Sequence, residues 1–121
     1  MYSYLIPTDQ QLAERTKLLI ESDLSVYDSI PVLASKVGTN SFKLKLVFQQ
    51  HYGETVFCFS RRVRIDAAKK LLLETNYTLQ TIGELVGYSE GSNFQVSFKN
   101  VVGETPGRWR NRGKGDVRGK R

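Results

Sequence analysis

Two short runs of side chains have the chemistry to contact the edges of nucleic-acid bases. Lysine can donate hydrogen bonds to guanine O6 or N7, and the amides of asparagine and glutamine match the N6 and N7 edge of adenine. In the first run we expect Lys45 to reach a base edge. The candidate base-contacting residues are Phe42, Lys43, Lys45 and Gln49 in the first run and Ser92, Asn93 and Gln95 in the second.

A second group of residues has the chemistry to bind phosphate. Helix N-termini, their capping side chains and basic residues supply many contacts to a nucleic-acid backbone, and these contacts fix orientation without reading sequence. Each such side chain could equally be a solvated surface group. The candidate phosphate-contacting residues are Asn40, Ser41, Arg61, Arg62, Ser89 and Lys99.

An internal repeat positions these residues. When the Val-Gly pair at 37–38 is aligned with the Val-Gly pair at 86–87, the neighbouring residues match with an offset of 49 before the turn and 50 after it. One inserted residue in the second turn accounts for the change, and a turn tolerates such an insertion. The matches include Leu33 with Ile82, Phe48 with Phe98, and residues 53–55 with residues 103–105.

The first copy has the pattern of a helix, a glycine-centred turn and a second helix. We expect a helix over 30–37 capped by Ser29, a break at Gly38, and a helix over 41–51 capped by Ser41. Such a pair of helices is a helix-turn-helix.

The second copy repeats the pattern with helices over 79–86 and roughly 91–102, separated by Gly87, with Thr78 as the first cap. In both copies, apolar residues at spacings of three and four give the second helix an inward face. The expected inward residues are Leu44, Val47 and Phe48 in the first copy and Phe94, Phe98 and Val101 in the second.

Between the copies, residues 56–74 have the apolar spacing of one helix of about 19 residues, and a shorter amphipathic helix is expected over 8–22. At about 1.5 Å per residue the spacer spans about 28 Å, comparable with the roughly 34 Å between successive major-groove faces on one side of B-DNA. Its length therefore suits tandem docking. The expected stripe is Val56, Phe59, Val63, Ala67 and Leu71, widened by Ile65, Ala68 and Leu72.

The distribution of charge matters more than the net charge of +6. Residues 108–121 carry seven basic residues and one acidic residue, which equals the whole net charge, and residues 36–73 carry eight basic residues and two acidic ones. The middle third is thus strongly positive. The glycines and charges after Asn111 leave little to bury, so we expect residues 113–121 to be a disordered basic tail.

The composition argues against several classes of function. The length of 121 residues and 40% apolar content fit one compact domain, and the absence of a long apolar run favours a soluble, cytoplasmic protein with no membrane partner. Cys58 and His51 are single residues of their types, so we expect no metal, no cofactor and no disulfide. A reactive Cys58 would suit a repair enzyme, but we expect a packed core thiol and no catalysis.

Residues 25–112 resemble the DNA-binding domain of the AraC/XylS family of bacterial transcription activators, and the match is carried by the second copy and the spacer. The motifs that carry the resemblance are IGELVGYSEGSNFQVSFK at 82–99, GETPGRWR at 103–110 and RRVRIDAAKKLL at 61–72. The resemblance implies an all-α module of about seven helices, with two helix-turn-helix subdomains joined by a long linker helix, that binds adjacent major-groove segments of double-stranded DNA.

With this resemblance the chain divides into five segments. Residues 1–24 form an N-terminal extension with the first helix, 25–54 the first helix-turn-helix, 55–75 the linker helix, 76–112 the second helix-turn-helix with a closing helix, and 113–121 the tail. We expect the domain alone to be monomeric.

Two positions depart from the family pattern. Leu46 and Val96 stand where family members often carry arginine, so we expect them either to be partly buried against neighbouring helices or, if exposed, to pack on a thymine methyl group, as Phe42 could.

A helical adaptor that binds a protein is the alternative function. Activators of the family also contact RNA polymerase, and the acidic first segment offers such a surface, although solvated charges explain it equally well. Its acidic residues are Asp9, Glu14, Glu21, Asp23 and Asp28.

Overall fold

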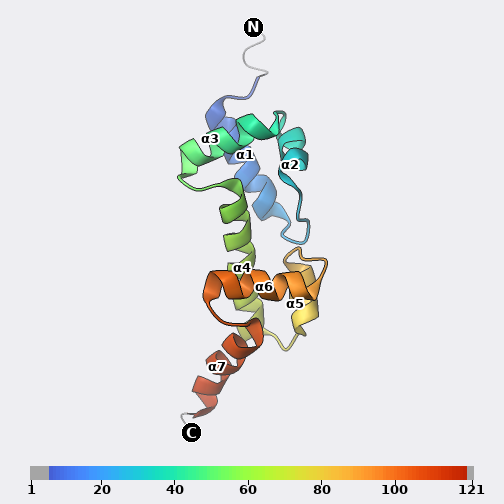
Figure 1. Ribbon diagram of the computed structural model, residues 1–121, viewed down its shortest axis with the longest axis vertical. Coiled ribbons are helices and arrows are strands. Elements are labelled where there is room, and N and C mark those ends of the chain that lie inside the picture. The colour runs from blue at the N-terminus through green and yellow to red at the C-terminus, as the bar shows by residue number, and fades with distance from the viewer. Residues whose placement is uncertain (1–5, 120–121) are drawn as a thin grey trace. The chain divides into compact units, whose positions relative to one another are not determined.

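Helix-forming sequence divided by capping residues and glycines gives an all-α chain (Figure 1). The computed structural model describes residues 6–119, and side chains as far as residue 115; within this part of the chain it contains helices and no strand, as predicted. The helices are α1 (Asp9–Ser22), α2 (Ile30–Val37), α3 (Ser41–Tyr52), α4 (Val56–Glu74), α5 (Leu79–Leu85), α6 (Gly91–Val102) and α7 (Pro106–Gly119).

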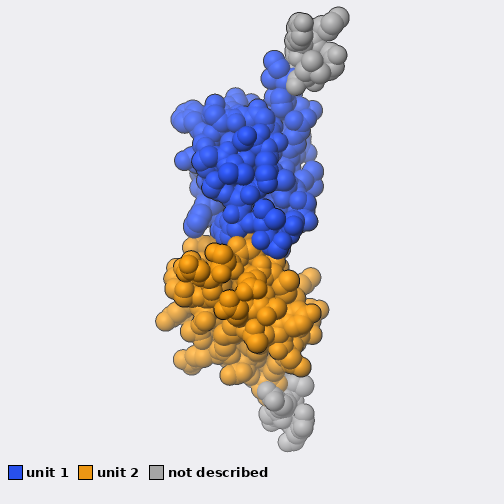
Figure 2. All heavy atoms as spheres, turned by 90° about the vertical axis from the view of Figure 1, so that its right-hand side faces the viewer, with its two compact units in different colours: residues 1–60 blue, residues 61–121 orange. Residues whose placement is uncertain are grey.

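The chain divides into two compact units, Met1–Ser60 and Arg61–Arg121 (Figure 2). We expected one compact domain. The difference arises because each repeat buries its own apolar residues, and α4 contributes its first turn to one unit and its remainder to the other. Each unit therefore carries one helix-turn-helix on a separate core.

The core of the first unit forms where α1, α2 and α3 pack against one another. Phe48 lies at its centre, with its ring centroid 4.8 Å from that of Tyr52 and 5.4 Å from that of Phe59. Burial, followed by the charges of Glu14 and Glu21, raises the pKa of Tyr52 above its ordinary value. The buried apolar residues are Leu12, Ala13, Ile20, Leu33, Ala34, Val37, Leu44, Val47, Phe48, Val56 and Phe59.

The core of the second unit is built on the aromatic side chains of α6. Phe98 makes edge contacts with Phe94 and Trp109, with centroid distances of 6.0 and 5.9 Å. At Gly83 in α5 an added Cβ would lie 3.1 Å from Cβ of Phe94, so the missing side chain allows α5 and α6 to approach closely. The buried cluster is Ile65, Ala68, Leu72, Ile82, Val86, Tyr88, Phe94 and Phe98.

The buried face of α4 differs from the expected stripe. Ile65, Ala68 and Leu72, expected to widen the stripe, are fully buried, whereas Val63 and Ala67 are only partly buried. A residue at every fourth position drifts by about 40° per step around a helix with 3.6 residues per turn, whereas alternating steps of three and four stay on one face. The face that packs is therefore the one with alternating spacing.

The turns of both helix-turn-helix pairs depend on glycine. Gly38 has φ of +93° and Gly87 has φ of +98°, a conformation that side chains with a Cβ rarely adopt. After Gly38, the Thr39 amide donates to the Ala34 carbonyl, and after Gly87 the Tyr88 amide donates to the Gly83 carbonyl. These bonds end α2 and α5 and turn the chain toward α3 and α6.

Helix α7 extends into the segment that we expected to be disordered. It continues to Gly119, and residues 120–121 of the expected tail lie outside the described residues. Lys114 donates from Nζ to the carbonyl of Thr75 (2.8 Å) and to Oδ1 of Asn76 (3.1 Å). Polar contacts thus hold the start of this segment in place. The expectation of disorder considered only apolar residues and did not include such contacts.

Arg110 caps the end of α4. Its guanidinium donates to the carbonyls of Leu72 (2.9 Å), Thr75 (3.3 Å) and Tyr77 (2.7 Å). The Leu72 carbonyl is in the last turn of α4, where carbonyls have no partner within the helix, and the other two carbonyls are in the loop that follows.

Substitution Arg110→Ala should lower the stability of the second unit by about 2 kcal/mol, because three hydrogen bonds from a charged donor to backbone carbonyls are lost. Arg108→Ala, which removes an exposed arginine of the same helix, should change stability by less than about 0.5 kcal/mol. Urea unfolding followed by the fluorescence of Trp109, the single tryptophan, measures both. Equal effects would show that Arg110 acts only through its charge.

Candidate nucleic-acid interface

The rotation of α3 is fixed by its buried residues. Leu44, Val47 and Phe48 face the core, as expected, so the opposite side of the helix faces solvent. The candidate residues on this helix and its cap are therefore accessible: Asn40, Phe42, Lys45 and Gln49 are exposed, and Ser41 and Lys43 are partly exposed.

Asn40, and not Ser41, caps α3. Its Oδ1 accepts a hydrogen bond of 2.8 Å from the backbone amide of Lys43, whereas Ser41 is already the first helical residue. Asparagine is as good a cap as serine, and the backbone at Asn40 is the extended one that a cap requires. The expected cap at Ser41 was therefore wrong by one residue.

The turn before α3 carries a shallow hollow with a volume of about 690 Å³. Hydroxyl and amide groups from Ser35, Thr39, Asn40 and Ser41 lie at its edge, together with Pro31, Ala34 and Gly38. Small polar groups beside the positive end of a helix dipole suit an anion.

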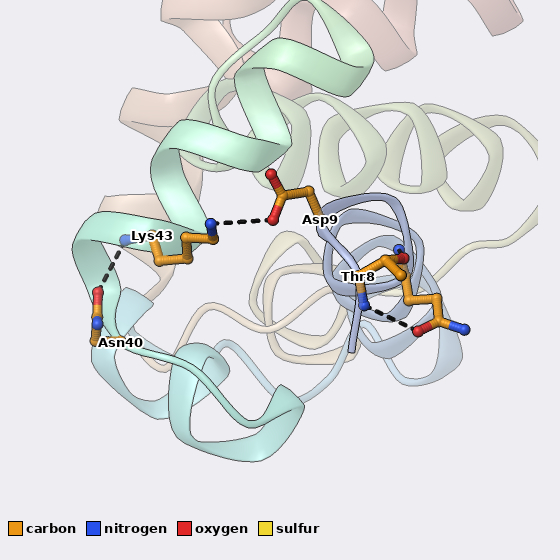
Figure 3. A network of polar contacts seen from close by, with 5 residues as sticks. Thr8, Asp9, Asn40 and Lys43 are labelled. Carbon is orange, nitrogen blue, oxygen red and sulfur yellow. Dashed lines mark hydrogen bonds and ion pairs between the residues drawn. The ribbon is translucent and has the colours of Figure 1, made fainter. Parts of the chain in front are cut away.

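Lys43 is held by an ion pair (Figure 3). Its Nζ lies 3.0 Å from Oδ1 of Asp9 in the first turn of α1, and both side chains are substantially exposed. Thr8 and Gln11 form a capping box that fixes this end of α1. Exposed pairs of this kind contribute at most about 1 kcal/mol, so a stronger anion can displace Asp9.

Helix α6 presents a comparable face with a different charge. Phe94 and Phe98 are buried, and Val101, expected to face inward, is exposed because Val102 packs on the core in its place. The N-cap position is occupied by Glu90, whose side chain makes no capping hydrogen bond. Exposed candidate residues here are Ser89, Ser92, Asn93, Gln95 and Lys99.

The basic run on α4 is divided by burial. Arg62 is exposed and Arg61 partly exposed, so both remain candidates for phosphate contact. Arg64 is only 1% exposed and is part of the packed interior.

Besides Val101, three apolar side chains on α3 and α6 are exposed. Phe42 is 77% exposed, Leu46 44% and Val96 60%. Of the two alternatives stated for Leu46 and Val96, exposure is the one observed, because the inward faces of both helices are filled by other residues.

The single cysteine is placed differently from the expected core thiol. Cys58 is exposed in the first turn of α4, where its backbone amide donates to Oγ1 of Thr55. Within the described residues, no three His, Cys, Asp or Glu side chains are grouped to hold a metal ion, and no helix is both long and apolar enough to cross a membrane.

Comparison with known proteins assigns the chain to a family. A model of the family described as helix-turn-helix domain matches residues 33–112, most of the chain. A crystal structure of a transcriptional regulator with an AraC-type DNA-binding domain, from Chromobacterium violaceum, is 26% identical with a TM-score of 0.72, over 84% of this chain and 90% of that one. The chain belongs to the AraC/XylS family of transcription regulators.

Two further proteins are similar to this AraC-type domain. The HTH-type transcriptional regulator ArgR of Pseudomonas aeruginosa is 26% identical over 98 residues, which are 81% of this chain and 30% of ArgR. The DNA-binding domain of the transcriptional factor AdpA, solved with a target DNA, has the same fold, with a TM-score of 0.75 at 19% identity over 85% of this chain and 94% of that one. The chain spans between 27% and 43% of the length of the first curated relatives.

The capping assignment can be tested directly. Asn40→Ala should lower the stability of the first unit by about 1 kcal/mol, because the amide of Lys43 loses its partner. Ser41→Ala should change it by less than about 0.5 kcal/mol. Thermal unfolding followed by circular dichroism compares them, and an equal loss for Ser41→Ala would contradict the assignment.

Asp9→Asn should increase affinity for random duplex DNA about threefold at low salt. In the unaltered chain, Lys43 must break its ion pair with Asp9, worth up to about 1 kcal/mol, before it can bind phosphate, and the substitution removes that cost. Glu14→Gln removes the same charge from an exposed position on α1 and is the control. Fluorescence anisotropy measures both affinities. An equal gain from Glu14→Gln would mean that only overall charge matters.

Proposed function

We propose that the chain reads a specific DNA sequence with α3 and α6, each inserted in a major-groove segment. The observation that carries the proposal is the orientation of these helices. Each buries an apolar face in the core of its own unit and leaves a face of hydrogen-bonding side chains exposed. A helix in the major groove requires such a face, since base edges there present donors and acceptors.

Different side chains suit different tasks in this proposal. Lys45 and Gln49 on α3, and Asn93 and Gln95 on α6, are exposed with donors that match purine edges. Asn40 and Ser41 line the hollow before α3, where a phosphate would meet the helix N-terminus. Among the remaining polar candidates, we assign Ser92 to a base contact. We assign Ser89, Arg61, Arg62 and Lys99 to contacts with phosphate.

Helix α3 should provide more of the electrostatic attraction than α6. It carries Lys43 and Lys45 and no acidic residue, whereas α6 carries Lys99 as its one basic residue. At the start of α3 the cap is a neutral asparagine, whereas at the start of α6 it is Glu90. A carboxylate at that position disfavours phosphate, so α6 depends more on hydrogen bonds than on charge.

The proposal includes partners beyond DNA. We propose RNA polymerase as one, because the exposed acids of α1, such as Glu14 and Glu21, lie on a different helix from the DNA-reading side chains of α3. Because bacterial DNA lies in the cytoplasm, the protein would act there. The proposal includes no catalytic step, and no role for Cys58 as a nucleophile.

The proposal is tested by selecting bound duplexes from a random library and measuring affinity for a selected and a random site. A regulator should prefer the selected site by at least about 10³-fold, with a log-log salt slope near −5 for about six phosphate contacts. A helical adaptor would show no preference at physiological salt, and that result would overturn the proposal.

The distribution of charge gives a separate prediction. Lys43→Gln with Lys45→Gln should weaken binding to the selected site by about tenfold or more, and more than Lys99→Gln does, since a good base contact is worth about 1–3 kcal/mol. Arg15→Gln, which removes a charge from an exposed position on α1, should have little effect. Comparable losses for the α3 and α6 variants would contradict the unequal roles.

A further inference from the structure

Each DNA-reading helix displays an aliphatic side chain at the same position. Leu46 is the sixth residue of α3, and Val96 is the sixth residue of α6. They are 44% and 60% exposed. Other apolar side chains are also exposed, among them Leu18, so exposure alone decides nothing. The recurrence at equivalent positions of the repeat is what requires an explanation.

Both side chains lie among the candidate DNA-contacting groups. In α3, Phe42 and Gln49 are four residues before and three residues after Leu46, and in α6 Asn93 and Lys99 are three residues either side of Val96. Residues at these separations are neighbours on a helix surface. Each aliphatic group is therefore at the centre of the exposed face, opposite the buried aromatic residues.

An aliphatic side chain in this place has one favourable partner in the major groove. The C5 methyl group of thymine is the apolar group among the base edges there, and burying one methyl is worth about fourfold in affinity. Against guanine or cytosine, the same side chain would cover donors and acceptors without pairing them, which is unfavourable.

We infer that Leu46 and Val96 each read the C5 methyl group of a pyrimidine, so that each half of the DNA site contains a thymine whose methyl is required. The inference rests on the proposed function and specifies what its two helices recognise. Phe42 adds a second apolar surface on α3, where the equivalent residue on α6 is Ser92. The half-site bound by α3 should therefore depend more on methyl groups.

The test replaces thymines of the selected site, one at a time, with deoxyuridine, which lacks only the methyl group. Fluorescence anisotropy with the full chain should show a loss of about fourfold at one or more thymines in each half-site. Leu46→Ala should abolish the difference between thymine and uracil in one half-site, and Val96→Ala in the other.

The control variants retain the fold and charge. Val101→Ala removes an exposed valine from another side of α6, and Leu18→Ala removes an exposed leucine from α1. Both should keep the full difference between thymine and uracil. Restoring a methyl with 5-methylcytosine, in a site where the critical T·A pair is changed to C·G, should regain part of the affinity for the unaltered chain and none for the matching alanine variant.

Two results would overturn the inference while leaving the proposed function intact. One is specific binding that tolerates uracil everywhere, and the other is a difference between thymine and uracil that persists in both alanine variants. Absence of any sequence preference would overturn the proposed function, and the inference with it.

Discussion

The burial of one apolar face on α3 and one on α6 is the constraint on which the rest of the structure depends. Leu44 and Phe48, and equally Phe94 and Phe98, can be buried only if each helix takes one rotation about its axis. That rotation decides which side chains reach solvent. An aromatic side chain buries a large area, so a rotated helix would lose several kcal/mol. The exposed polar faces are thus a consequence of core packing.

Local interactions then change the charge and the available donors on the exposed faces of α3 and α6. On α3, Asn40 is committed to the helix end and Lys43 is held against Asp9, which leaves Lys45 and Gln49 as exposed donors. On α6, Glu90 makes the helix N-terminus less attractive to an anion. The two copies therefore share geometry and differ in electrostatics.

Hydrogen bonds from distant side chains complete the second unit. Arg110 pairs with carbonyls at and beyond the end of α4, and Lys114 bonds to the following loop. In the sequence both residues appear only as positive charges of the basic segment 108–121. In the folded chain they act as hydrogen-bond donors that attach α7 to the second unit. A basic segment near a chain end is thus partly structural here.

The sequence by itself determined the helices, their order and the two helix-turn-helix pairs, because apolar spacing, glycines and caps are local signals that residues 30–37 and 91–102 carry strongly. It also determined the inward faces of α3 and, apart from Val101, of α6. Tertiary structure decided what depends on distant neighbours: the pairing of Lys43 with Asp9, the exposure of Cys58, Leu46 and Val96, the burial of Arg64, and the helix beyond Asn111. Each of these depends on which atoms a fold brings within a few ångströms, and the spacing of residues along one helix contains no such information.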